Sequence, residues 1–140
     1  MRAILDTSVL IGTDVSPIPG ELAISIGSIA ELHFGVLVAR SERVRARRLR
    51  RLGSLLRRFD PLPVDDAVAA SYGELAAAVV QAGRQPRART MDLLIAATAH
   101  AHDARLYTHN VKDFVAFEGL VEVVSAGQRP LQAGQPAPKR

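Results

Sequence analysis

The chain has 140 residues, of which 48% are hydrophobic and 23% are charged, so its length and composition predict one folded domain. It has no cysteine, which excludes disulfides, thiolate metal sites and a cysteine nucleophile. The net charge of +4 comes mainly from arginine and favours polyanionic partners. No apolar run has the length of a membrane span, and Asp6 interrupts the stretch that a signal peptide would need, so we expect a cytoplasmic protein without membrane contacts.

The first half of the chain predicts two strands and three helices. "RAILD" is an apolar run that predicts a buried strand ending at Asp6, followed by a short helix in "TSVLIG". "LAISI" (22–26) predicts a second strand, and a helix follows it over residues 28–40. A longer amphipathic helix is predicted from Ser41 to Phe59. Its expected apolar stripe consists of Leu49, Leu52, Leu56 and Phe59, and arginine occupies most of its other positions.

The second half predicts three more strands and two more helices. "PLPV" (61–64) reads as an edge strand limited by its prolines, and Asp65 or Asp66 is expected to cap a helix that runs to about Gln81. A basic loop over residues 83–89 leads to a helix over 90–102 that is apolar on nearly every side and should therefore be buried. The last two strands are predicted in "RLYT" (105–108) and "LVEVV" (120–124).

Strands that alternate with helices predict a mostly parallel sheet covered on both faces. The expected fold is therefore a three-layer α/β/α domain with a five-stranded sheet over residues 1–125. Residues 126–140, rich in glycine and proline, are expected to form a flexible tail. Sheets of this kind bind ligands beyond the carboxyl ends of their strands, so the residues at these ends are candidates for a site.

Four acidic residues from distant segments lie at or near these strand ends: Asp6, Glu31, Asp92 and Asp113. Each has a structural explanation. Asp6 can cap a helix, Ser28 and Glu31 fit a capping box, Asp92 suits the positive end of a helix dipole, and Asn110 with Asp113 resembles a capped turn. The case for function depends on their convergence. Clustered carboxylates repel one another unless a cation is present, and Mg²⁺ prefers oxygen ligands. An acidic cluster in a basic chain therefore suggests metal-dependent cleavage of phosphodiesters.

Four ordered blocks carry a family resemblance: "ILDTSVLI" (4–11), "SIAELHFGV" (28–36), "MDLLIAATA" (91–99) and "LYTHNVKDF" (106–114). Together they resemble the PIN-domain ribonucleases, in particular the VapC-type toxins of bacterial toxin–antitoxin pairs. The resemblance implies a Mg²⁺-dependent endoribonuclease, with Mn²⁺ able to substitute, that cuts RNA to leave a 5′-phosphate and a 3′-hydroxyl. It also implies a five-stranded PIN-like sheet, a homodimer, and a small VapB-like antitoxin as partner.

The resemblance also assigns roles to individual positions. Asp6 and Asp92 match the acids that hold the metal ion directly, while Glu31 and Asp113 match the acids that hold metal-bound water or a second ion. Thr108 and Asn110 match a T-x-N element that supports the acidic pocket. The RNA target and the cut site are not implied.

Two alternatives remain open on the residues alone. One is a phosphoryl-transfer or receiver-like domain with Asp6 as acceptor, although "DTS" lacks the second acid of a D-x-D-x-T motif. The other is a non-enzymatic nucleic-acid-binding module that uses the arginines between Arg40 and Arg58. These arginines are equally compatible with contacts to RNA, to an antitoxin or only to solvent.

Overall fold

A single parallel sheet forms the centre of the molecule. The computed structural model describes residues 2–12, 17–117 and 119–127. Four strands, β1 (Arg2–Leu5), β2 (Glu21–Ala23), β3 (Arg105–Thr108) and β4 (Val123–Ser125), lie in the order β2-β1-β3-β4, and every neighbouring pair is parallel. The predicted parallel α/β fold is confirmed. Within the described residues, no helix is long and apolar enough to cross a membrane.

The prediction of a fifth strand in "PLPV" is wrong. Leu62 makes only an isolated parallel bridge to Ser25, in which the Leu62 amide donates to the Ile24 carbonyl (2.8 Å) and the Ile26 amide donates to the Leu62 carbonyl (2.9 Å). Proline lacks the amide hydrogen that a strand ladder needs. Because prolines flank Leu62 on both sides, pairing stops after one residue.

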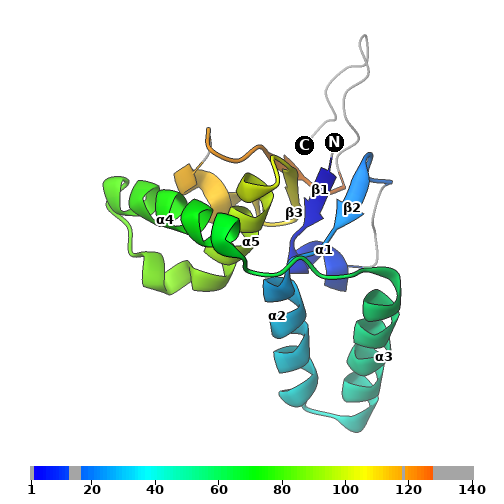
Figure 1. The fold of residues 1–140 in the computed structure, drawn as a ribbon. Helices are drawn as coiled ribbons and strands as arrows, with labels where there is room; N and C mark the ends of the chain where they lie inside the picture. Colours follow the sequence, from blue (N-terminus) through cyan, green and yellow to red (C-terminus); the bar gives the residue numbers. More distant parts are fainter. Residues whose placement is uncertain (1, 13–16, 118, 128–140) are drawn as a thin grey trace, which may run out of the picture.

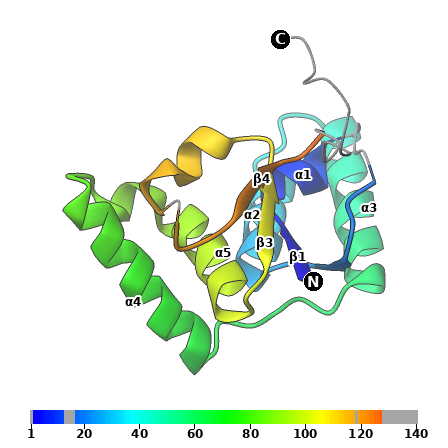
Figure 2. The ribbon, with the colours of Figure 1, turned by 90° about the horizontal axis from the view of Figure 1, so that it is seen from above.

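Helices cover both faces of the sheet (Figures 1 and 2). They are α1 (Thr7–Ile11), α2 (Ile26–Leu37), α3 (Glu42–Arg58), α4 (Asp66–Gln81) and α5 (Thr90–Ala101), with 3₁₀ helices η1 (Pro86–Arg89) and η2 (Val111–Phe117). Asp65 caps α4 as predicted, because its side chain accepts from the Val68 amide. The expected flexible tail falls mostly on residues 128–140, which lie outside the described residues, whereas Ala126 is buried and donates to the Thr108 carbonyl.

The alternation of strand side chains divides the core into two layers. Ile4 and Leu106 point to one face, where they pack with residues of α4, α5 and η2. Leu5 and Tyr107 point to the other face, where they pack with residues of α1, α2 and α3. Each strand therefore stabilises both layers and has little freedom to move at its carboxyl end.

The helix α5 is the most enclosed element, as its sequence predicts. Its buried residues are Leu93, Ile95, Ala96, Ala97, Thr98 and Ala99. Thr98 donates its hydroxyl hydrogen to the Leu94 carbonyl at 2.8 Å and lies 3.3 Å from the Ser25 hydroxyl oxygen. Because α5 is packed on several sides, its first turn is held in place relative to the sheet.

The helices α2 and α3 form a hairpin that extends away from the sheet (Figure 1). The predicted stripe on α3 is wrong in part: Leu52 and Leu55 are buried, whereas Leu49 and Leu56 are 56% and 43% exposed. Because a hairpin projecting from the sheet contacts the rest of the molecule along only part of its length, it leaves apolar side chains uncovered.

Candidate functional site

Asp6 is held at the junction of β1 and α1. Its amide donates to the Tyr107 carbonyl (2.9 Å), which continues the pairing of β1 with β3, and its carbonyl accepts from the Val9 amide to begin α1. It occupies the N-cap position of α1, yet its side chain makes no capping hydrogen bond. Asp6 as a whole residue is only 5% exposed. The simple capping explanation for Asp6 therefore does not describe its side chain.

Two hydroxyls hold the Asp6 carboxylate. Ser8 Oγ donates to Asp6 Oδ2 at 2.7 Å, and Thr108 Oγ1 donates to the same oxygen at 2.8 Å. The amides of His109 and Asn110 in turn donate to the Ser8 and Thr108 hydroxyl oxygens, at 3.0 and 2.9 Å. Each hydroxyl thus accepts from the backbone and gives its hydrogen to the carboxylate, which fixes the orientation of the Asp6 side chain.

The second oxygen of Asp6 is left available. No hydrogen bond reaches Asp6 Oδ1 from the described residues, and none of their fully buried side-chain oxygens lacks a partner, so Oδ1 has contact with solvent. The structure places Thr108 directly on the carboxylate, whereas Asn110 contributes its backbone amide. The sequence patterns do not single out Ser8, although it lies two residues after Asp6 in "DTS".

Glu31 lies on α2, within reach of α1. Thr7 Oγ1 donates to Glu31 Oε1 at 2.6 Å and lies 3.1 Å from Ser28 Oγ. The predicted capping box of Ser28 with Glu31 is wrong, because α2 begins earlier and its N-cap is Ser25, whose side chain accepts from the Gly27 amide. Glu31 is therefore free of a capping role and is oriented by Thr7, a second residue that the sequence patterns did not single out.

Asp92 lies in the first turn of α5 and is influenced by the other three acids. Burial, followed by the negative charges of Asp6, Asp113 and Glu31, raises the pKa of Asp92 to about 6, and the positive charge of Arg89 opposes this rise. These charges influence Asp92 through Coulomb interactions, which do not require direct contact. The other three predicted acids therefore all lie near enough to Asp92 to influence it electrostatically.

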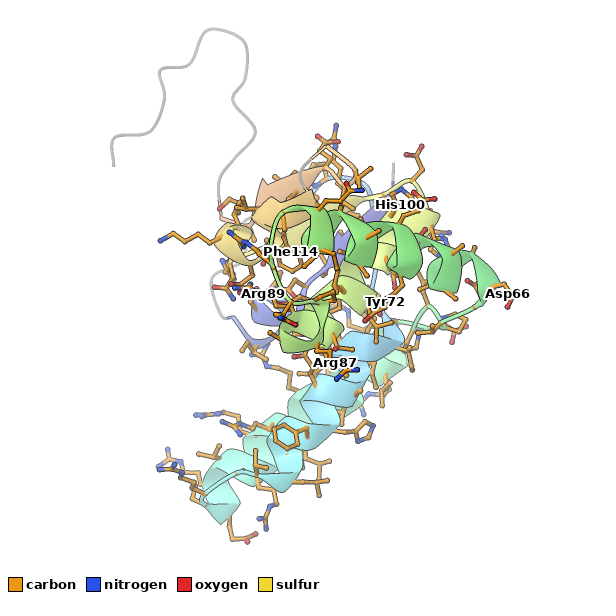
Figure 3. All side chains as sticks on the ribbon, turned by 90° about the vertical axis from the view of Figure 1, so that its left-hand side faces the viewer. Asp66, Tyr72, Arg87, Arg89, His100 and Phe114 are labelled. Atoms are coloured by element: carbon orange, nitrogen blue, oxygen red, sulfur yellow. The ribbon has the colours of Figure 1, made fainter. Side chains whose placement is uncertain are left out.

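Asp113 forms an ion pair with Arg89. Arg89 Nη1 donates to Asp113 Oδ1 at 3.0 Å and to the Asp113 carbonyl at 3.2 Å, which joins the start of α5 to η2. Figure 3 shows Arg89 and Phe114 together on this side of the molecule. Both side chains of the ion pair are partly exposed. The ion pair therefore ties η2 to the residue that precedes α5.

The other acids influence Asp92 without forming a ready-made metal-ligand group with it. Within the described residues, no three His, Asp or Glu side chains lie close enough together to hold one metal ion. Charges interact over longer distances than a coordination bond spans. The absence of such a group is therefore compatible with the raised pKa of Asp92. The chemistry of these groups fits a hard divalent cation, which prefers oxygen ligands. Asp6 Oδ1 has no hydrogen-bond partner among the described residues, and burial and the neighbouring acids disfavour the negative charge of Asp92, which a cation would balance.

The histidines do not join this region as metal ligands. His100 Nδ1 lies 2.7 Å from the Ser71 hydroxyl, and His102 Nδ1 accepts from Arg2 Nη1 at 2.8 Å. His109 is exposed and contributes its amide to Ser8. The candidate site is therefore built from carboxylates and hydroxyls.

Two curated proteins are similar to this chain over most of its length. Ribonuclease VapC5 of Mycobacterium tuberculosis is 37% identical over 126 residues, which cover 86% of this chain and 90% of that protein. Ribonuclease VapC4 of the same organism is 35% identical over 130 residues, or 89% of this chain and 96% of that protein.

Solved structures of related proteins have the same fold. The crystal structure of VapBC-5, a member of the VapBC family of toxin–antitoxin systems from M. tuberculosis, matches with a TM-score of 0.77 and 35% identity over 89% of this chain and 97% of that chain. FitAcB from Neisseria gonorrhoeae matches with a TM-score of 0.69 and 27% identity, over 86% of this chain and 95% of that chain. Residues 3–119 match the model of the PIN domain family. The chain belongs to the PIN-domain family.

Proposed function

We propose that this PIN domain is a Mg²⁺-dependent endoribonuclease that hydrolyses RNA phosphodiesters in a site made by Asp6, Glu31, Asp92 and Asp113. The observation that carries the proposal is the raised pKa of Asp92, to which all three other acids contribute. A site that disfavours its own negative charge favours a divalent cation. The relatives named ribonucleases support RNA as the substrate.

The chain's own groups suit distinct tasks in this reaction. Asp6 Oδ1 and the Asp92 carboxylate are the direct metal ligands in our proposal, and Mn²⁺ is expected to replace Mg²⁺ because both prefer oxygen ligands. The bound ion would supply an acidified water and positive charge for the phosphodiester. Glu31, oriented by Thr7, would hold and orient water at the edge of the site. Asp113 would have the same role, while Arg89 sets its position.

The hydroxyl network keeps Asp6 ready as a ligand. Ser8 and Thr108 both donate to Oδ2, so they fix the carboxylate plane and leave Oδ1 for the cation. Asn110 supports the network through its amide. These residues would act through Asp6, as positioning residues.

We also propose a biological context. The VapBC-5 structure belongs to a toxin–antitoxin system, which supports the inference that this chain is a toxin with a small VapB-like antitoxin as partner. We further propose that it acts in the cytoplasm as a homodimer, with residues 1–125 as the nuclease domain. Growth arrest on expression, relieved by co-expression of the neighbouring small reading frame, would test this context.

The direct test of the activity is RNA cleavage by the purified chain in Mg²⁺, in EDTA and after substitution. Asp6→Asn and Asp92→Asn should each lower the rate by about a thousandfold, because they remove metal ligands. Asp103→Asn is the matched control: Asp103 is exposed with φ 50°, a conformation that asparagine tolerates, and it should cleave like the wild type. Cleavage that survives EDTA and both site substitutions would refute the metal mechanism.

A further inference from the structure

A cavity of about 670 Å³ lies between α1, α2 and α3, beside the acidic site. We call it the α2–α3 cavity. The lining residues that matter here are Glu31, Phe34, Gly35, Arg47, Arg48 and Arg51. Glu31 belongs to the acidic site as well, so a molecule in the cavity would reach the region around Asp92.

Three arginines line one side of the cavity, and none of them forms an ion pair with a carboxylate among the described residues. Arg48 Nη1 donates to the Gly35 carbonyl at 2.7 Å, and Arg51 Nη1 donates to the Leu10 carbonyl at 2.6 Å. These acceptors are neutral. Within the described part of the chain, none of the ion pairs involves Arg47, Arg48 or Arg51. Two of the guanidinium groups are thus held by the backbone, and their positive charge remains available to an anion.

The α2 side of the cavity offers an aromatic face and open space. Phe34 is 65% exposed although it is one of the few aromatic residues in the chain. Gly35 leaves room beside it, because a Cβ at this position would meet nothing within 4 Å. An exposed aromatic ring beside fixed arginines is the combination with which proteins bind single-stranded nucleic acids, by stacking bases and contacting phosphates.

We propose that the α2–α3 cavity binds single-stranded RNA, with phosphates against Arg47, Arg48 and Arg51 and one base stacked on Phe34. This rests on the proposed ribonuclease function and adds the path by which the strand reaches the acids. The acidic site itself repels phosphates, so an adjoining region of unbalanced positive charge is needed to hold the strand. A duplex would not suit the cavity, because its bases are already stacked on each other.

Salt-dependent binding tests the charge contacts. The probe is a fluorescent single-stranded RNA of about 12 nucleotides, and every variant carries Asp6→Asn so that the probe stays intact. Arg47→Gln with Arg48→Gln should weaken binding about tenfold and reduce the slope of log affinity against log salt by about 1.4, which corresponds to two lost phosphate contacts. Arg43→Gln with Arg50→Gln changes the same charge on the same helix outside the cavity lining and should alter the slope by less than about 0.5.

Two further pairs test the ring and the space. Phe34→Ala should weaken binding at least about fivefold without changing the salt slope, because stacking releases no counterions. Its control is Leu37→Ala, which removes another exposed apolar side chain of α2. Gly35→Leu should block the cavity, whereas Gly73→Leu places the same side chain at an equally open glycine of α4 and should bind normally.

The outcomes separate this proposal from the proposed function. The proposal would be overturned if the two arginine pairs had equal effects on RNA binding. It would also be overturned if neither Phe34→Ala nor Gly35→Leu affected RNA binding, and the cavity would then be a site for a protein partner. Cleavage is measured separately with Asp6 intact. If the binding results are as expected but the wild-type chain cuts no RNA, the RNA-binding role of the cavity stands and the proposed ribonuclease function is refuted.

Discussion

The acidic site and the α2–α3 hairpin differ in how firmly the fold fixes their charged side chains. Asp6 is buried and bound by two hydroxyls that are themselves bound by backbone amides. Arg48 lies on an exposed helix surface and makes one hydrogen bond to a carbonyl. Short side chains fixed in a core set the geometry of a reaction, whereas long side chains on a surface attract a ligand and tolerate variation in its position.

This contrast predicts a large difference in stability effects. Thr108→Val keeps the shape of a buried side chain but removes a donor from Asp6 and an acceptor from the Asn110 amide. We expect it to lower the free energy of unfolding by about 2 to 3 kcal/mol. Arg48→Gln removes an exposed hydrogen bond and should cost less than about 0.5 kcal/mol. Urea denaturation measures both, and equal costs would show that the two regions do not differ as described.

The burial of Asp92, together with repulsion by the other acids, predicts that its charge destabilises the metal-free fold. The folded chain holds the pKa of Asp92 at about 6, above its ordinary value of 3.8, so between these values the folded state binds more protons than the unfolded state. Charging Asp92 therefore reduces stability as the pH rises through 6. In EDTA at pH 7.5, Asp92→Asn should raise the free energy of unfolding by about 1 to 2 kcal/mol, after allowance for solvent screening at a partly exposed side chain.

The pH dependence provides the control for this prediction. The advantage of Asp92→Asn should shrink as the pH falls from 6 toward 4, because the wild-type carboxyl becomes protonated and loses its penalty. Chemical denaturation at a series of pH values measures this difference. A variant that is less stable than the wild type at pH 7.5 would mean that burial and the neighbouring acids do not disfavour the charged form of Asp92.

Arg89 allows a finer test, because it is an arginine that belongs to the acidic site. Its charge opposes the rise in the Asp92 pKa, so Arg89→Gln should raise that pKa further in the metal-free protein. NMR titration of the Asp92 carboxyl carbon measures the change. Arg87→Gln removes a neighbouring charge that makes no ion pair with Asp113 within the described residues and should have a smaller effect. If the pKa of Asp92 were the same in both variants, Arg89 would have no special influence on the acidic site.

Local patterns were sufficient to predict most of the fold. The apolar run of β1 and the all-round apolar character of α5 predict their burial directly, because each element is enclosed by neighbours. The same patterns failed where a single residue decides the outcome. Prolines reduced the expected strand at 61–64 to one bridge, and a serine earlier in the chain than Ser28 took the capping role.

The candidate site was predicted in part, and for a physical reason. Its acids follow strand ends and carry a family resemblance, so they can be selected from the chain alone. The hydroxyl network cannot, because Thr108 lies 102 residues from Asp6 in the sequence and meets it only through the pairing of β1 with β3. Serine and threonine are common, and only the fold shows which of their hydroxyls face a carboxylate.

The most direct test of the four-acid site is the effect of a divalent cation on thermal stability, which requires no substrate. A cation that binds only the folded chain raises its melting temperature with concentration. We expect Mn²⁺ and Mg²⁺ to do so for the wild type and for Asp103→Asn, and to have little effect on Asp6→Asn or Asp92→Asn. The same rise in all four proteins, or in none, would contradict the claim that these carboxylates form a cation site.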